Sequence, residues 1–219
     1  MPKRSGSISD VRKKVTLTHD FISTAHHEAG HAVYALLHHM MVYSVTMFQN
    51  KKNKMAEGWT HYYSLEFDKI QDPVLKQERI TAEICLSYAG LAAERYQYKL
   101  HSGSDKFLFC LDGSRKDRKE ASAIIKKYDL APVGRPRTNY KNRMIRKASR
   151  ELQEHWDAVT LIAHALFRKK RLSYDKLRVL LTTKTDNKEF WKERFKDISH
   201  YYDNEQAIEE KDFASMISK

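Results

Sequence analysis

Residues 17–40 carry the pattern that most restricts the fold, because their apolar side chains recur at the spacing of an α-helix. Thr18 or Asp20 offers an N-cap for this helix. The segment therefore predicts a helix with one face in the core. The apolar positions that define this face are Ile22, Ala25, Ala29, Ala32, Val33, Leu36, Leu37 and Met40.

The rest of the chain predicts further helices and a small sheet. Residues 42–49 alternate and contain β-branched side chains, and residues 59–67 are a second strand candidate, antiparallel to the first. The expected fold class is therefore mainly α with a small β-sheet, an α+β fold. The further helices are predicted from Asp72-Pro73 to about Lys99, from about Ser114 to Tyr128, over residues 140–169 and over residues 172–181.

Three parts are expected along the 219 residues, which are enough for one good-sized domain. Residues 1–16 are polar and basic and predict a loose N-terminal arm. Residues 17–182 hold the predicted helices and strands and form the domain. Residues 183–219 are a polar and aromatic C-terminal extension, which either packs as a helix or stays mobile.

Composition argues against a membrane protein and against a disulfide scaffold. No run comes near the roughly 18 apolar residues that a membrane span needs. The basic N-terminus is not followed by the apolar run of a secretory signal. Cys85 and Cys110 are the two cysteines, and the absence of a CxxC pattern fits a reducing compartment. We therefore expect a cytoplasmic protein with no membrane contact.

Residues 27–31, His-Glu-Ala-Gly-His, form an HExxH pattern inside the first predicted helix. Residues four apart lie on one helix face, so His27 and His31 can direct imidazole nitrogens at one metal ion. Glu28 is placed to hold a water on that ion and to take its proton. The other histidines of the helix, which lie off this face or about 10 Å further along the axis, are His26, His38 and His39.

A catalytic zinc needs a third protein ligand, and spacing alone does not choose one. The downstream candidates are Glu94, His101, Asp105, Asp112 and Asp117. Ser114-x-x-Asp117 is also a capping-box-like pattern at a predicted helix start, which explains an acid at Asp117 without a metal.

Several stretches resemble one family in the same order. The stretch "AHHEAGHAV" (25–33) resembles the zinc-binding helix of the FtsH-type metallopeptidase domain, the proteolytic half of the membrane-bound AAA proteases. The stretch "YAGLAAERY" (88–96) resembles the Gly-x-Ala-Ala-Glu helix of that family. The stretch "DGSRKDRKEASAII" (112–125) resembles the segment that delivers its third zinc ligand. The resemblance covers about residues 22–182.

This resemblance implies a zincin-like helical metallopeptidase domain that binds Zn²⁺. It implies zinc ligands at His27, His31 and Asp117, while Asp112 stays open as the main alternative for the third ligand. It further implies that Glu28 is the general base and that Glu94 orients a ligand.

The sequence also departs from that family. None of its seven glycines belongs to a Gly-x4-Gly-Lys-Ser/Thr phosphate loop, and Ala89 replaces the second glycine before Ala-Ala-Glu. We therefore expect a free-standing, ATP-independent zinc endopeptidase whose protein or peptide substrate is flexible or delivered by a partner. The strand at 42–49 is expected to bind this substrate as an added edge strand. The oligomeric state is left open.

A net charge of +12 supports a different hypothesis. The chain would then be a non-catalytic, metal-containing binding module whose basic surface binds nucleic acid or an acidic partner. The basic stretches that would carry this role are "RPRTNYKNRMIRK" (135–147) and "RKKR" (168–171). A peptidase that cuts one cognate repressor-like protein is a third hypothesis, which uses the same site as the first.

Overall fold

Two long helices form the centre of the fold, which is described from a computed structural model. The structure describes residues 8–63, 67–103, 114–200 and 202, with side chains from residue 20 onward. Helix α1 spans Ile8–Leu37 and helix α2 spans Pro73–Ser102. They cross at Gly30 of α1, where an added Cβ would lie 2.6 Å from Ala93 Cβ. Glycine and alanine at this crossing therefore allow the two helices to approach closely.

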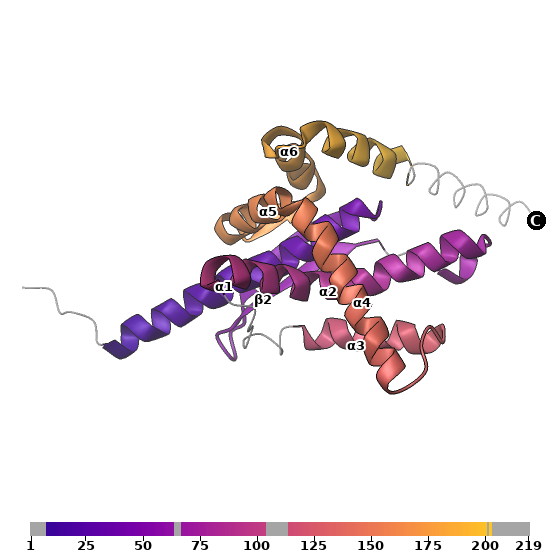
Figure 1. Cartoon of the computed structure of the whole chain (residues 1–219). Coiled ribbons are helices and arrows are strands. Elements are labelled where there is room, and N and C mark those ends of the chain that lie inside the picture. The colour runs from indigo at the N-terminus through magenta and orange to yellow at the C-terminus, as the bar shows by residue number, and fades with distance from the viewer. Residues whose placement is uncertain (1–7, 64–66, 104–113, 201, 203–219) are drawn as a thin grey trace, which may run out of the picture.

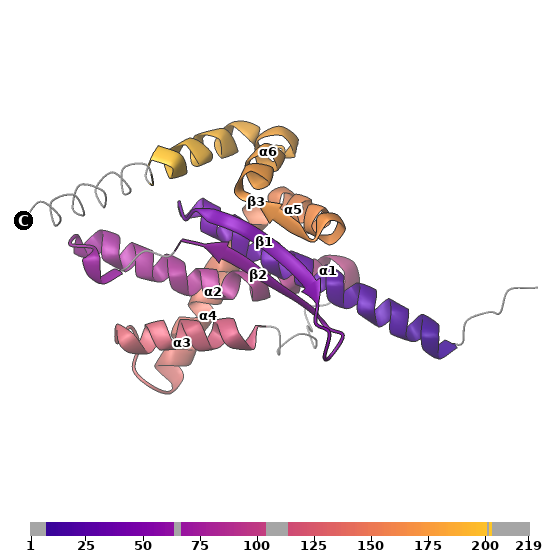
Figure 2. The ribbon, with the colours of Figure 1, turned by 180° about the vertical axis from the view of Figure 1, so that it is seen from behind.

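A three-stranded antiparallel sheet packs on α1, as Figure 2 shows. Its strands are β1 (Val42–Gln49), β2 (Ala56–Tyr62) and β3 (Arg171–Ser173), in the order β2-β1-β3. The expected antiparallel pairing of the first two strands is confirmed. The second strand lies at 56–62 rather than at the predicted 59–67.

Strand β1 is the centre of the sheet, not its edge. It pairs with β2 on one side and with β3 on the other. The expectation that residues 42–49 bind a substrate as an edge strand is therefore wrong, because their backbone groups already pair with two neighbours. The outer edge of β2 has no strand partner in the part of the chain that the structure describes.

Four shorter helices follow α2 along the chain in Figure 1, and a helical segment over residues 188–200 comes after them. The four are α3 (Arg115–Lys127), α4 (Arg135–Glu154), α5 (Trp156–Lys169) and α6 (Tyr174–Lys184). The single helix predicted over 140–169 is wrong, since the chain leaves the helical conformation at His155 (φ −122°, ψ 32°). Helix α4 also begins earlier than predicted, because Pro136 lies in its first turn, where proline is tolerated.

Two apolar clusters hold these helices together. The larger one joins α1, β1, α2 and the helices from α4 onward, and it includes Tyr34, Leu86 and Leu166. The smaller one packs α3 and the start of α4 on α2, through residues such as Ile84 and Ile125. Helix α2 therefore belongs to both clusters and connects them.

Both ends of the predicted domain need revision. Helix α1 begins at Ile8, so the prediction of a loose arm over residues 1–16 is wrong for residues 8–16. Residues 188–200, in the predicted extension, are helical and pack on the rest of the molecule (Figure 1). This segment and residue 202 bring four buried side chains into the larger cluster, namely Trp191, Phe195, Ile198 and Tyr202.

The fold class is confirmed at the coarse level: the chain is mainly helical with one small antiparallel sheet. Of the helices that the structure describes, none combines the length and the apolar character needed to cross a membrane.

Candidate metal centre

Three side chains from two helices converge at one point. His27 and His31 lie one turn apart on α1, and their Nε2 atoms are 3.0 Å apart. Asp117, in the first turn of α3, places its Oδ2 atom 3.1 Å from His27 Nε2 and 3.5 Å from His31 Nε2. Within the described ranges, this is the one group of His, Cys, Asp or Glu side chains with the spacing to hold a metal ion.

Helix α2 orients both imidazole rings. His31 Nδ1 donates to the carbonyl of Leu86 at 2.9 Å, and His27 Nδ1 lies 3.3 Å from Glu94 Oε1. A proton on each Nδ1 leaves a lone pair on each Nε2. Two imidazole lone pairs and the Asp117 carboxylate then face one another, and either a proton or a metal ion between them offsets their mutual repulsion.

The spacing of these atoms fits zinc. A tetrahedral ion with ligands at about 2.0–2.2 Å separates its ligand atoms by about 3.3 Å, and the three observed separations are 3.0, 3.1 and 3.5 Å. Gly90 of α2 keeps the centre open. A Cβ atom there would lie 2.5 Å from His27 Nε2 and 2.6 Å from His31 Nε2, so any larger residue would displace the rings.

Among the candidates for the third ligand, Asp117 faces the two histidines. Ser114 is the N-cap residue of α3 but makes no side-chain capping hydrogen bond, while the carboxylate of Asp117 is directed at the histidines. His101 is exposed, and its Nδ1 donates to the carbonyl of Gln97. Asp105 and Asp112 lie outside the described residues.

Glu28 is held between α1 and the sheet. Its side chain is buried, and Oε2 accepts a hydrogen bond from Thr60 Oγ1 of β2 at 2.8 Å. Gly58 of the same strand touches it, since a Cβ atom at that position would lie 2.4 Å from Glu28 Cγ. Sequence reasoning missed Thr60 and Gly58, because a threonine and a glycine in a strand region carry no chemical signal of their own.

Burial and opposite charge act against each other in this centre. Burial lowers the pKa of His27, but the carboxylates of Glu94, Asp117 and Glu28 outweigh it and raise that pKa well above 6.5. Burial raises the pKa of Asp117, but contacts with His27 and His31 outweigh it and lower that pKa well below its usual range. For Glu28 burial prevails over the nearby histidines and raises the pKa.

A cavity of about 670 Å³ opens beside these residues. It is lined by α1, by β2, by α2 and by the first turns of α3, including Lys116 and Glu120. Trp59 of β2 lines the same cavity and is 56% exposed. The centre is therefore accessible from solvent along β2.

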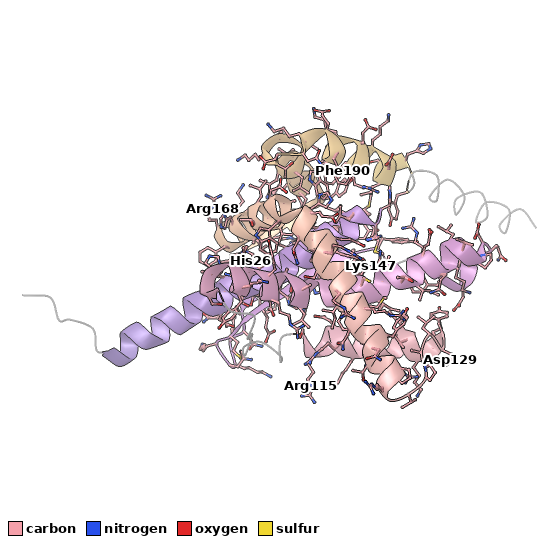
Figure 3. All side chains as sticks on the ribbon, in the orientation of Figure 1. His26, Arg115, Asp129, Lys147, Arg168 and Phe190 are labelled. Atoms are coloured by element: carbon pink, nitrogen blue, oxygen red, sulfur yellow. The ribbon has the colours of Figure 1, made fainter. Side chains whose placement is uncertain are left out.

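The remaining histidines of α1 and its end lie elsewhere. The ring of His26 stacks on Trp156 and its Nδ1 donates to the carbonyl of Ile22 (His26 is labelled in Figure 3). His38 Nε2 pairs with Glu151 at 2.8 Å, and His39 contacts Arg194.

No protein-family model matches this chain, and no curated protein matches it either. The geometry of the site is therefore the main evidence for what the protein does.

Proposed function

We propose that this protein is a zinc-dependent endopeptidase with a zincin-like site that resembles the FtsH-type peptidase domain. One observation carries the proposal: a His-His-Asp group with the spacing of a zinc site lies beside the buried carboxylate of Glu28, in a cavity along a free strand edge. Two imidazole ligands, one carboxylate ligand and an adjacent base form the usual set of a hydrolytic zinc centre.

His27, His31 and Asp117 are the residues that would hold the ion. Bound Zn²⁺ supplies a Lewis acid and lowers the pKa of water toward 7. Glu94 acts through His27, since its carboxylate faces the Nδ1 atom of that ring at 3.3 Å and keeps Nε2 free for the metal.

Glu28 is the proposed general base. Thr60 holds its Oε2 atom, which leaves Oε1 to accept a proton from the attacking water. Burial raises the pKa of Glu28, which brings its basicity closer to what proton transfer near neutral pH requires. The same carboxyl then delivers the proton to the leaving amine.

Strand β2 is the proposed docking element for the substrate. Its outer edge is unpaired by any described strand, and all seven of its residues line the cavity. An extended peptide that pairs with this edge passes the Glu28 carboxyl at Gly58, where the strand has no side chain. This mode of binding requires a flexible segment, so the substrate is already unfolded there or a partner delivers it.

Replacement of Glu28 by Gln tests the proposal. The Glu28→Gln variant should bind zinc like the wild type, while cleavage of an unfolded protein such as casein falls at least about 100-fold, as expected for loss of a general base. Zinc content by mass spectrometry and cleavage by gel or fluorescence provide the two readouts.

Glu120→Gln is the matched control, because Glu120 lines the same cavity from α3, away from the docking strand, and pairs with Lys116 instead of facing the metal ligands. This control should retain most of the activity. Equal cleavage by wild type and Glu28→Gln, or a zinc-loaded wild type without any cleavage, would overturn the proposal.

A further inference from the structure

Most of the net charge of the protein is concentrated in two neighbouring helices. Residues 115–154, which form α3, α4 and their connection, carry 13 Lys and Arg but 5 Asp and Glu, a net +8 of the total +12. The two helices pack together on α2 through the smaller apolar cluster, and Lys141 Nζ of α4 bonds Ser122 Oγ of α3 at 2.8 Å. The two helices lie next to each other in the lower part of the molecule (Figure 1).

The outer face of α4 has an unusual composition. Its exposed residues follow one another mostly at intervals of three and four, so they form one stripe along the helix. We call this face the arginine–amide stripe. It consists of Arg135, Asn139, Asn142, Arg143, Arg146, Arg150 and Gln153.

Among the described residues of α4, one exposed acidic side chain, Glu154, borders the four arginines of the stripe. Among the described residues, none of its four arginines forms an ion pair, although Arg143 lies 5.3 Å from the centre of the Tyr140 ring. Of the two acidic residues of α4, Glu151 is paired with Lys147 and His38, and Glu154 is exposed at the end of the helix, four residues after Arg150, with no ion pair to a described residue.

Ordinary solvent-exposed helices instead pair opposite charges at i,i+4, as Lys116 and Glu120 do on α3. Arg146 and Arg150 are a like-charge pair at this same spacing, which destabilises a helix. A bound polyanion would remove this repulsion.

The types of side chain point to duplex DNA. Arginine binds phosphates and guanine edges, and asparagine and glutamine bind adenine edges, so the stripe holds both kinds of group. An acidic peptide would engage the arginines but would give the three amides no role. The major groove of B-DNA, about 12 Å wide, admits an α-helix, whereas the groove of A-form RNA is too narrow.

We propose that the arginine–amide stripe of α4 binds duplex DNA in the major groove. Exposed basic residues of the neighbouring helix α3, namely Arg115, Lys119 and Lys126, add to the positive charge that would attract the DNA. Figure 3 shows α4 crossing the front of the molecule with Lys147 labelled on it, and Figure 2 shows β2 on the opposite side. The stripe is therefore separate from the candidate metal centre, and the inference stands without the proposed function.

Binding of the full-length protein to a fluorescent duplex of ~30 base pairs, about three helical turns, provides the test. The triple variant Arg143→Gln, Arg146→Gln, Arg150→Gln should bind at least about tenfold more weakly. A plot of the logarithm of the association constant against the logarithm of the salt concentration has a negative slope. The magnitude of this slope should decrease by about 2–3, because each lost phosphate contact removes about 0.9 from it.

The matched control changes three exposed lysines of α6 and of the helical residues 188–200, as Lys176→Gln, Lys184→Gln and Lys188→Gln. It removes the same charge and should change the affinity by less than about threefold. Thermal unfolding of both variants establishes that they are folded, since all six positions are exposed.

Three results would overturn the inference. The first is a wild type that does not bind duplex DNA. The second is an equal loss of affinity in the two triple variants, which would indicate attraction by net charge alone. The third is competition by polyglutamate or by duplex RNA as effective as competition by DNA, which would assign the stripe to a different partner.

Discussion

At the candidate metal centre, α2 supplies none of the three proposed ligands, but it contacts both proposed histidine ligands. The Leu86 carbonyl fixes one ring, the Glu94 carboxylate faces the other, and Gly90 leaves space between them. This arrangement gives a physical reason for a glycine one turn before a glutamate on the same helix. The glycine provides space, and the glutamate provides orientation.

Two glycines should therefore have different effects when they are replaced by alanine. Gly90→Ala places a methyl group within 2.6 Å of both Nε2 atoms, so it should weaken zinc binding by at least about tenfold, as loss of ligand orientation does. Gly58→Ala places a methyl group against Glu28, so it should reduce cleavage while zinc binding is retained. Competition with a chromophoric chelator measures the zinc affinity of each variant.

A third glycine variant provides the control. Gly103 ends α2 and has no neighbour within 4 Å of an added Cβ, so Gly103→Asn, which tolerates its positive φ of 64°, should leave zinc binding and cleavage unchanged. Normal zinc affinity in Gly90→Ala would contradict the placement of the metal between the two rings.

Local spacing was enough to predict part of this centre. His27, Glu28 and His31 lie within five residues of one helix, so helical periodicity alone brings them together. Asp117 is 90 residues from His27 in sequence, and its position depends on how α3 packs on α2. The sequence therefore left Asp112 open as an alternative, and the Leu86 carbonyl could not be predicted because every residue has one.

At the scale of elements, the errors in prediction come from structures that depend on distant partners. Strand β3 is three residues long and exists because it pairs with Ser44–Thr46 of β1. Its sequence reads equally well as the start of the following helix. The break at His155 is similar, since no proline or glycine marks it. Helices such as α2, in which apolar residues recur at helical spacing over many turns, are predicted correctly because their own residues determine them.

One electrostatic bridge joins the end of α1 to α4. Glu151 accepts from His38 Nε2 at 2.8 Å and from Lys147 Nζ at 2.7 Å. Burial opposes ionisation of this carboxyl, but the two hydrogen bonds outweigh it and lower the pKa of Glu151 to about 2. Because the pKa is depressed in the folded state, the stabilisation is present above the usual pKa of 4.5 and is lost as the pH falls toward 2.

Replacement of Glu151 should therefore lower the free energy of unfolding by an amount that depends on pH. At pH 7, Glu151→Gln should lower the free energy of unfolding by about 1–2 kcal/mol, a value reduced for the partial exposure of the pair. The difference from wild type should narrow as the pH falls from about 5 to 3. Urea unfolding across this range measures the difference.

Glu154→Gln is the comparison, since Glu154 lies on the same helix, is exposed and has no salt bridge to a described residue. Its effect should be small at every pH. If Glu151→Gln lowers the free energy of unfolding by the same amount at every pH from 7 to 3, the contacts of Glu151 with His38 and Lys147 contribute no charge-dependent stability.

At the scale of the whole molecule, the candidate metal centre adds a second link between two apolar clusters that α2 already joins. His27 and His31 belong to α1 in the larger apolar cluster, whereas Asp117 belongs to α3, which packs on α2 through the smaller cluster. A metal held by all three side chains crosslinks the two clusters. Its binding free energy then contributes to the stability of the folded chain as a whole.

Zinc should therefore raise the unfolding temperature of the protein. At a free zinc concentration of about 100 times the dissociation constant, the stabilisation is about 2.7 kcal/mol. For a chain of this size it corresponds to a rise of about 5–10 °C in Tm relative to protein treated with a chelator. Differential scanning fluorimetry with and without EDTA measures the shift, and Asp117→Asn should reduce it to less than half.

Asp112→Asn is the deciding comparison, because Asp112 is the alternative ligand in the same segment. If Asp117 is the third ligand, Asp112→Asn keeps the full zinc-dependent shift. The opposite pattern, with the shift lost in Asp112→Asn and kept in Asp117→Asn, would move the third ligand to Asp112. In that case the metal would join α1 to the residues that precede α3 in the sequence. The contacts of Asp117 with His27 and His31 would then belong to the metal-free protein alone.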